Sequence, residues 1–194
     1  MAFKAVVIGV SSGGLEALKV LVPGLRPDFA LPVLIVQHLA PHADSYLPVC
    51  LNALSPLTVK EAEDKEALRP GVVYVAPPDY HLLVEADATL SLSVDPKVNF
   101  SRPAVDVLFE TASDAFGPAL VGIVLTGANH DGAAGLARIK RRGGLAIVQS
   151  PESAQAPTMP QAAIGATAVD HILSLHEIAP FLNHLIGPCH DQRA

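Results

Sequence analysis

Cysteine and long apolar runs are both scarce in this chain. Only two cysteines occur, Cys50 and Cys189, far apart and without C-x-x-C spacing. They offer neither a disulfide framework nor a structural zinc site, and they favour a reducing compartment. No apolar run reaches the ~18 residues that a membrane span needs, and the N-terminus shows no cleavable signal pattern. We therefore expect a cytoplasmic chain without direct membrane insertion.

Charge is also scarce, at 16% of the 194 residues, and the net charge is -6. The one basic cluster, at 140–142, fits the C-terminal turn of a helix, where cations interact favourably with the helix dipole. Nucleic acid is therefore not expected as a partner. Half of the residues are hydrophobic, which excludes a disordered chain and allows a full core.

The order of apolar patterns predicts an α/β fold. Short β-branched runs alternate with helical periodicity, which is typical of a doubly wound, mostly parallel sheet with helices on both faces. Three β-type runs within 71–94 predict antiparallel β-hairpins inserted into it. Because no linker or repeat interrupts the pattern, we expect one domain over 1–190 and a tail at 191–194. Buried strands are expected at 4–10, 32–39, 119–127 and 145–149, a further strand at 57–62, and helices at 14–22, 44–54, 103–116, 132–144, 159–167 and 174–186.

The loop "GVSSG" at 9–13 follows the first strand and leads into a helix, a place that suits either a phosphate or a nucleophile. The dinucleotide fingerprint G-x-G-x-x-G is absent because residue 11 is serine, and no Walker-type Gly-Lys-Ser/Thr occurs. Gly9 and Gly13 match the G-x-x-x-G of short-chain dehydrogenases. That family also needs a tyrosine four residues before a lysine, and none of the three tyrosines meets this spacing. A nucleotide-binding oxidoreductase is thus a weak alternative.

The same loop fits G-x-S-x-G, which presents a serine on a tight strand-to-helix turn. Ser11 would be the nucleophile, and the N-terminus of the helix could stabilise an oxyanion beside it. The alternative is that Ser11 or Ser12 only caps the helix. The motif by itself leaves both interpretations open.

A serine nucleophile needs a base, normally histidine. His38 stands at the carboxyl end of the second buried strand, on the same edge of the sheet as Ser11. It could instead satisfy backbone groups at a strand end. His42 forms H-x-x-x-H with His38, a spacing that could bind metal, but Pro41 between them disfavours the helix that paired ligands require.

The carboxylate that orients the base should lie at another strand end. Asp131 follows a buried strand and precedes a glycine-rich helix start, where an aspartate is also a favoured N-cap. Asp44, Asp79 and Asp106 are rivals that the spacing does not exclude. The residues alone predict a hydrolase with Ser11, His38 and an unspecified acid. A binding module that accepts a methylated or carboxylated peptide without turnover is the alternative.

Six stretches together resemble the catalytic domain of the CheB family, the bacterial chemotaxis protein-glutamate methylesterases. They follow the family's order and span essentially the whole chain: "VVIGVSSGGLEAL", "VLIVQHLAP", "VYVAPPDYHL", "RPAVDVLFE", "GIVLTGANHDGAAGL" and, more weakly, "TMPQAAI". The resemblance implies hydrolysis of glutamate γ-methyl esters on chemoreceptors, and deamidation of particular glutamines by a similar route. The hydrolysis that the resemblance implies requires no metal or organic cofactor.

Carried over by motif, the resemblance makes Ser11 the nucleophile, His38 the base and Asp131 the orienting carboxylate. Ser12 stands where the family commonly has threonine, and backbone N–H groups around Ala128 would help to hold the oxyanion. Ala128 replaces a methionine typical of chemotaxis enzymes, and His130 lies beside the acid. These two changes suggest that the substrate could be another methylated protein.

Chemotaxis enzymes of this family usually carry an N-terminal receiver domain, whereas this chain begins at the first strand of the catalytic domain. The resemblance therefore predicts either a catalytic fragment or a stand-alone member. For a stand-alone member, a separate receiver protein would be a candidate partner beside the methylated substrate.

Overall fold

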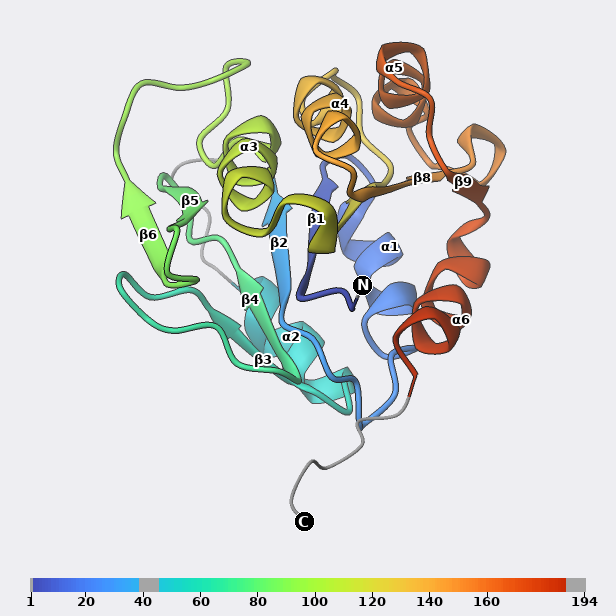
Figure 1. Cartoon of the computed structure of the whole chain (residues 1–194). Helices are drawn as coiled ribbons and strands as arrows, with labels where there is room; N and C mark the ends of the chain where they lie inside the picture. Colours follow the sequence, from blue (N-terminus) through green and yellow to red (C-terminus); the bar gives the residue numbers. More distant parts are fainter. Residues whose placement is uncertain (1, 39–45, 188–194) are drawn as a thin grey trace.

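The computed structural model describes residues 2–38 and 46–187, which form a parallel seven-stranded sheet between two layers of helices (Figure 1). The strand order is β3-β4-β2-β1-β7-β8-β9, with a separate antiparallel pair, β5–β6. The predicted doubly wound, mostly parallel α/β fold is confirmed. The strands are β1 (Ala5–Val10), β2 (Val33–Gln37), β3 (Thr58–Glu61), β4 (Val72–Val75), β5 (His81–Val84), β6 (Leu90–Ser93), β7 (Leu120–Val124), β8 (Leu145–Gln149) and β9 (His171–Leu173).

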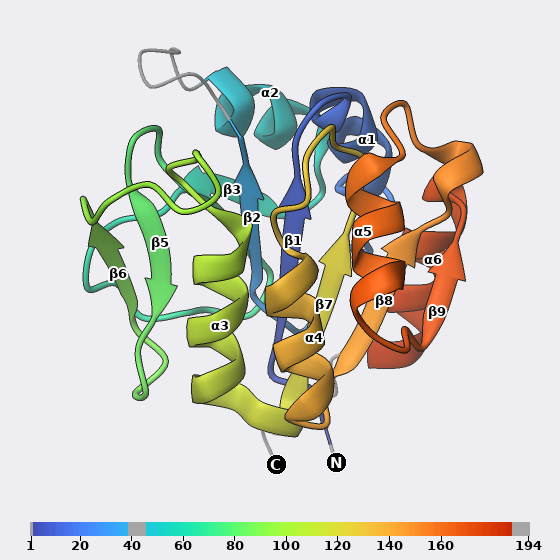
Figure 2. The same ribbon diagram turned by 90° about the horizontal axis from the view of Figure 1, so that it is seen from above.

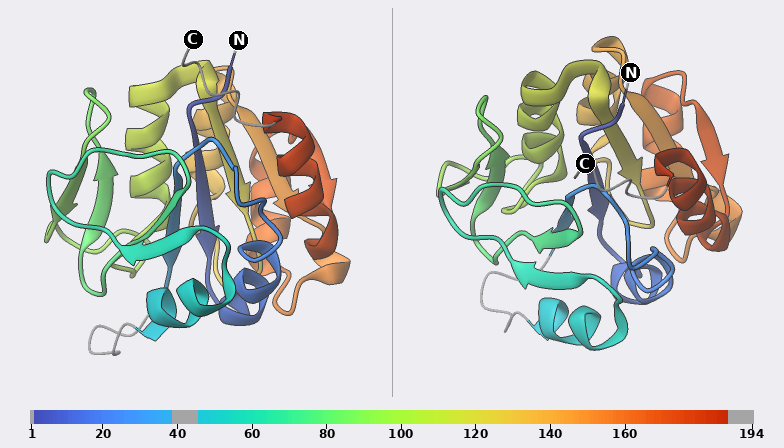
Figure 3. Two further views of the ribbon diagram at one scale, coloured as in Figure 1. Left: turned by 90° about the horizontal axis from the view of Figure 1, so that it is seen from below. Right: turned by 60° about the horizontal axis from the view of Figure 1, so that its bottom comes forward.

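Helices cover both faces of the sheet, as the alternating pattern predicted. Helices α3, α4 and α5 lie on one face, and α1, α2 and α6 lie on the other (Figure 3). None of the helices in the described ranges combines the length and apolarity that crossing a bilayer requires. The helices are α1 (Gly14–Leu21), α2 (Tyr46–Leu54), α3 (Val105–Phe116), α4 (Ala133–Arg141), α5 (Thr158–Ala166) and α6 (Leu175–Ile186), with short 3-10 turns η1 (Gly117–Ala119) and η2 (Pro151–Ser153).

Strand β1 lies at the centre of the sheet and is buried along its whole length. Val6, Ile8 and Val10 pack into the layer of α1 and α6, whereas Ala5 and Val7 pack into the layer of α3. Successive side chains of a strand point to opposite faces, so a strand covered on both sides must be apolar throughout. This is why the first segment reads as an uninterrupted apolar run.

The structure corrects the prediction for residues 71–94. Only β5 and β6 form an antiparallel hairpin, while β4 pairs in parallel with β2 and β3. Val73 and Val75 pack into one layer and Tyr74 into the other, so β4 is buried on both faces like the interior strands β1 and β2. A short apolar run does not by itself reveal its pairing partner.

The start of one helix and the presence of one strand also differ from expectation. Helix α3 begins at Val105 and not at Pro103, because Ala104 is extended, with φ -114° and ψ 139°. The short edge strand β9 was not predicted, since three residues, of which Ile172 is exposed, leave too brief a pattern to detect.

The register of the parallel strands aligns the loops that carry the predicted site. Val10 at the end of β1 pairs with Gln37 at the end of β2, so Ser11 and His38 follow neighbouring positions. The ladder continues past both strand ends, since the His38 N–H donates to the Val10 carbonyl oxygen at 3.1 Å. The strand arrows point toward the edge where α1 begins (Figure 2). Ligands of open α/β sheets bind at this edge.

Gly9 is required because α3 packs directly against β1. A Cβ at Gly9 would lie 2.2 Å from Cγ1 of Val105, a stiff β-branched side chain that begins α3. We expect Gly9→Ala to lower the free energy of unfolding by about 1–3 kcal/mol through overpacking, measured by urea denaturation. Gly165→Ala is the matched control, because nothing lies within 4 Å of its added Cβ in α5. It should be neutral or stabilising by about 0.5–1 kcal/mol, and an equal loss in both variants would contradict the packing explanation.

Candidate active site

The loop after β1 turns sharply into α1. Gly13 is the residue before the helix and has φ 80°, a left-handed conformation that suits glycine, and neither serine makes a capping hydrogen bond to α1. The interpretation of Ser11 or Ser12 as a helix cap is therefore wrong. A Cβ at Gly14 would lie 1.9 Å from Oε1 of Gln37, so the helix start also needs glycine to approach β2.

Ser11 lies between the ends of β1 and β7. Its N–H donates to the Thr126 carbonyl oxygen at 3.0 Å, and a Cβ added at Gly127 would be 3.0 Å from the Ser11 Cβ. The loop after β7 thus passes directly beside the serine. Within 2–38 and 46–187, the N–H groups of Ser12 and Ala128 donate to no backbone carbonyl, which keeps both as candidate donors to an oxyanion.

His38 is paired with Asp131. Its Nε2 lies 2.8 Å from Oδ2 of Asp131, and the exposed fractions of the two side chains are 11% and 0%. The two residues are 93 positions apart in the chain. They meet because β2 and β7 lie on either side of β1 and end at the same edge of the sheet.

Asp131 also accepts hydrogen bonds from the start of α3. The N–H groups of Val105 and Asp106 donate to its carboxylate at 2.7 and 3.0 Å, and Asn99 Nδ2 donates at 2.9 Å. Burial alone would raise the pKa of Asp131, but the hydrogen bonds from His38, Asn99 and the two N–H groups outweigh it and lower the pKa. The carboxylate is therefore held ionised.

Asp131 does not cap the helix that follows it. The residue before α4 is Gly132, with φ 92° and no side-chain cap, so the alternative interpretation of Asp131 as a local N-cap is wrong. Instead Asp131 satisfies free N–H groups of α3, which precedes it in the chain. A negative charge there also suits the dipole of α3.

The other described candidates for the carboxylate beside His38, Asp106 and Asp79, have different partners. Asp106 accepts from the N–H groups of Gly132 and Gly135 and from Asn99, without contacting His38. Asp79 pairs with Arg102 at 2.8 Å. Asp44 lies outside the described residues, as does His42 of the H-x-x-x-H alternative. In the part of the chain that the structure describes, no group of three or more His, Cys, Asp or Glu side chains could hold a metal.

Asn129 occupies the other side of the imidazole. Its Nδ2 lies 3.2 Å from His38 Nδ1, and its Oδ1 accepts from the Asp131 N–H at 3.0 Å. In the described ranges, no hydrogen bond joins the Ser11 hydroxyl to His38. Both ring nitrogens are therefore engaged, one by a carboxylate and the other by an amide.

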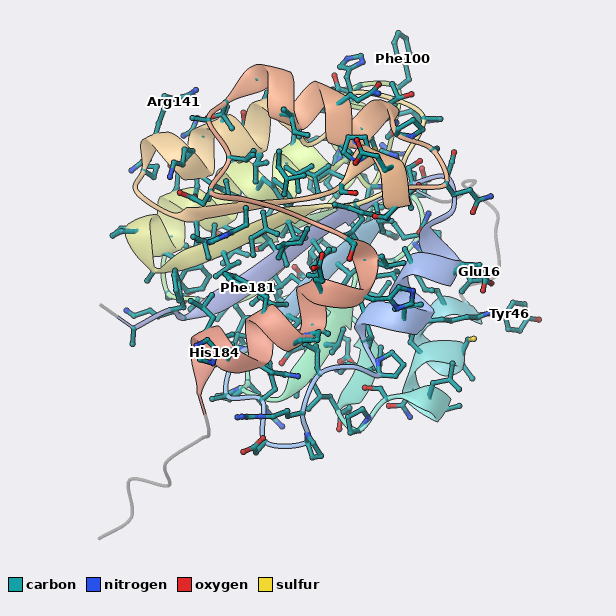
Figure 4. The ribbon with its side chains drawn as sticks, turned by 90° about the vertical axis from the view of Figure 1, so that its right-hand side faces the viewer. Glu16, Tyr46, Phe100, Arg141, Phe181 and His184 are labelled. Carbon is teal, nitrogen blue, oxygen red and sulfur yellow. The ribbon has the colours of Figure 1, made fainter. Side chains whose placement is uncertain are left out.

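A pocket of about 550 Å³ opens beside Ser11, lined also by Leu15, Gln37 and Cys50. Glu16 and Tyr46 border it and lie on one side of the molecule, whereas Phe100 projects from the top of the same view (Figure 4). Tyr46 is 71% exposed and Phe100 is 92% exposed. Tyr46 thus presents an exposed aromatic side chain at the border of the pocket.

The profile of the CheB methylesterase family matches residues 6–182. This chain belongs to the CheB methylesterase family. The crystal structure of the Thermotoga maritima CheB methylesterase catalytic domain superposes with a TM-score of 0.91 at 36% identity, covering 95% of this chain and 100% of that domain.

The CheB relatives of this chain differ in length. A Symbiobacterium thermophilum protein named protein-glutamate methylesterase/protein-glutamine glutaminase is 37% identical over 95% of this chain, which spans only 51% of that relative. A Leptospira interrogans protein that carries the same name provisionally is 52% identical over 92% of this chain and 93% of its own length. CheB relatives thus include one about as long as this chain.

Sequence reasoning missed three residues of this CheB site. Asn99 and Asn129 contact the predicted acid and base, and Gln37 donates to the Ser11 and His38 carbonyl oxygens at 3.0 Å each. Asparagine in a loop reads as an ordinary turn residue. The one available signal was the position of Asn129 two residues before Asp131, which is the spacing of an Asx turn.

Asn99 joins two buried carboxylates, since its Nδ2 donates to both Asp106 and Asp131 at 2.9 Å. Burial, and then the charge of Asp131, raise the pKa of Asp106 against the opposing N–H bond from Gly135. Removing the amide of Asn99 should lower the free energy of unfolding most at pH values where both carboxylates are ionised. We expect Asn99→Ala to lower the free energy of unfolding by about 1.5–3 kcal/mol at pH 7.

The direction in which this loss of stability changes with pH follows from the two pKa shifts. As pH falls, Asp106 takes up its proton first because its pKa is raised, and the repulsion that Asn99 relieves then disappears. The loss should therefore be smaller at pH 4 than at pH 7, measured by urea denaturation. Asn52→Ala is the control, since Asn52 accepts from the uncharged Val59 N–H at 2.8 Å. Its loss should vary less between the two pH values, and a parallel response would contradict the bridging role.

Proposed function

We propose that this chain is a protein-glutamate methylesterase that works as a serine hydrolase with Ser11, His38 and Asp131. The single observation that carries the proposal is the buried His38–Asp131 pair at the end of β2, in register with Ser11 at the end of β1. Membership of the CheB methylesterase family supports the same reaction. The proposed unit is one catalytic domain over 1–190 with a tail at 191–194.

In the proposed reaction, Ser11 attacks the ester carbonyl and His38 takes its proton. Because Nε2 faces Asp131, the accepting nitrogen is Nδ1. The N–H groups of Ser12 and Ala128 would hold the oxyanion, and methanol leaves with the proton from His38. Water then attacks the acyl-enzyme by the same route. The bond between serine and base would form in the substrate complex, as catalytic hydrogen bonds often do.

The proposed substrates are glutamate γ-methyl esters on chemoreceptors or on another methylated protein. Glutamine side chains would be deamidated by the same site, because an amide passes through a similar tetrahedral intermediate. We propose that the chain acts in the cytoplasm, with a separate receiver protein as its regulator.

Ser11→Ala should abolish methanol release from methylated receptor and labelling by a fluorophosphonate probe, because the variant lacks the nucleophile. Labelled peptide mapping and a methanol assay provide the measurements. Ser91→Ala, in β6 of the separate hairpin, is the control and should keep both properties. An unlabelled wild-type protein that still binds methylated peptide would instead support a binding module. Release from a small methyl ester but not from receptor would reject only the proposed substrate.

Asp131→Asn should lower turnover about 10⁴-fold, because an amide cannot hold the imidazole in the required tautomer. Asp106→Asn is the matched control, since it changes a buried carboxylate of the same cluster that does not touch His38. Both variants should lose stability in thermal melts, but Asp106→Asn should retain far more turnover. Equal losses of turnover would mean that Asp131 acts only through the stability of α3.

A further inference from the structure

The amide of Asn129 lies between the backbone of Asp131 and the ring of His38. Oδ1 is 3.0 Å from the Asp131 nitrogen and Nδ2 is 3.2 Å from His38 Nδ1. The backbone N–H of Asp131 can only donate, so it must face the amide oxygen. The NH₂ group must therefore face His38, and the orientation of the amide is not arbitrary.

This orientation assigns the proton on the imidazole. An amide NH₂ is a donor, so His38 Nδ1 must carry the lone pair, and the ring proton lies on Nε2, where Asp131 accepts it at 2.8 Å. If His38 became protonated, its Nδ1–H would point at the NH₂ group. The amide could not turn over without leaving the Asp131 N–H against a second N–H.

We propose that Asn129 is a positioning residue that holds the neutral ring of His38 with its lone pair on Nδ1 and its proton on Nε2, the form in which the base can accept the serine proton. A hydrogen bond to the neutral form of a group disfavours the charged form. The inference rests on the proposed role of His38 as the base. Nδ1 has one lone pair, so the Ser11 hydroxyl must replace the amide during attack.

The charged surroundings of His38 act in the opposite direction to Asn129. Carboxylates near an imidazole favour its protonated form, whereas a donor to Nδ1 and burial of the ring oppose it. The charged or titratable groups concerned are Asp131 in direct contact, Asp106 behind it through Asn99, Glu16 on the rim of the Ser11 pocket, and exposed His130 next to Asn129 in the chain.

Two substitutions at residue 129 should shift the protonation midpoint of His38 in a set order. Asn129→Ala removes the donor and should raise the midpoint by about half a pH unit, the equivalent of one ordinary hydrogen bond. Asn129→Asp keeps the shape and can still accept the Asp131 N–H, but places an acceptor against Nδ1. It should raise the midpoint by more than about one pH unit.

Two measurements follow this order. Long-range ¹H–¹⁵N spectra of the His38 ring, assigned by the signal lost in His38→Gln, report its tautomer and titration without needing activity. The wild-type ring should carry its proton on Nε2 at neutral pH. The acid limb of methanol release against pH should move upward in the same order, while the plateau of Asn129→Ala at higher pH stays at or above that of wild type.

His130→Gln is the control for a disturbed loop and should leave the His38 midpoint in place. Equal His38 midpoints in wild type, Asn129→Ala and Asn129→Asp would overturn the proposal, as would a wild-type ring protonated on Nδ1. A lower plateau at an unchanged midpoint would mean that Asn129 only supports the loop. Because the titration is independent of turnover, these outcomes are distinct from failure of the esterase proposal, which Ser11→Ala tests.

Discussion

The buried carboxylate of Asp131 is the group on which the rest of the site depends. A buried charge without partners is strongly unfavourable, and this one is satisfied by four donors from three segments. They are the His38 ring after β2, the first two N–H groups of α3, and the amide of Asn99. Satisfying the charge therefore requires β2, α3 and the loop before α3 to be in place together.

Parallel strand geometry brings these segments together. β1 is flanked by β2 and β7, and the three strands end at one edge of the sheet. Residues that are distant in the chain therefore lie side by side just after these strand ends. Glycine makes the close approaches possible. Gly9 admits α3 against β1, and Gly14 admits Gln37 against the start of α1. The small residues of the G-x-S-x-G loop thus serve packing as well as exposure of the serine.

The roles of Asp131 illustrate how far local sequence reasoning extends. An aspartate before a glycine-rich helix start suggests a cap for that helix, yet the helix it caps is α3, which begins 26 residues earlier. Its charge is thereby placed for His38 as well. The rival Asp106 is also buried and also binds N–H groups, but its pKa is raised where that of Asp131 is lowered. The difference comes from the partners, since only Asp131 has His38.

Local sequence was enough to predict the α/β architecture and the positions of Ser11 and His38 at strand ends, because apolar periodicity and glycine-serine loops reflect burial and turns over a few adjacent residues. The family resemblance added Asp131. Packing settled what local sequence left open: β4 joins the parallel sheet, Asp131 and not Asp106 or Asp79 contacts His38, and Asn129 and Asn99 contact the pair. Those facts depend on hydrogen bonds and strand pairings formed after packing. The residues next to a side chain in the sequence do not identify the partner that it contacts in the fold.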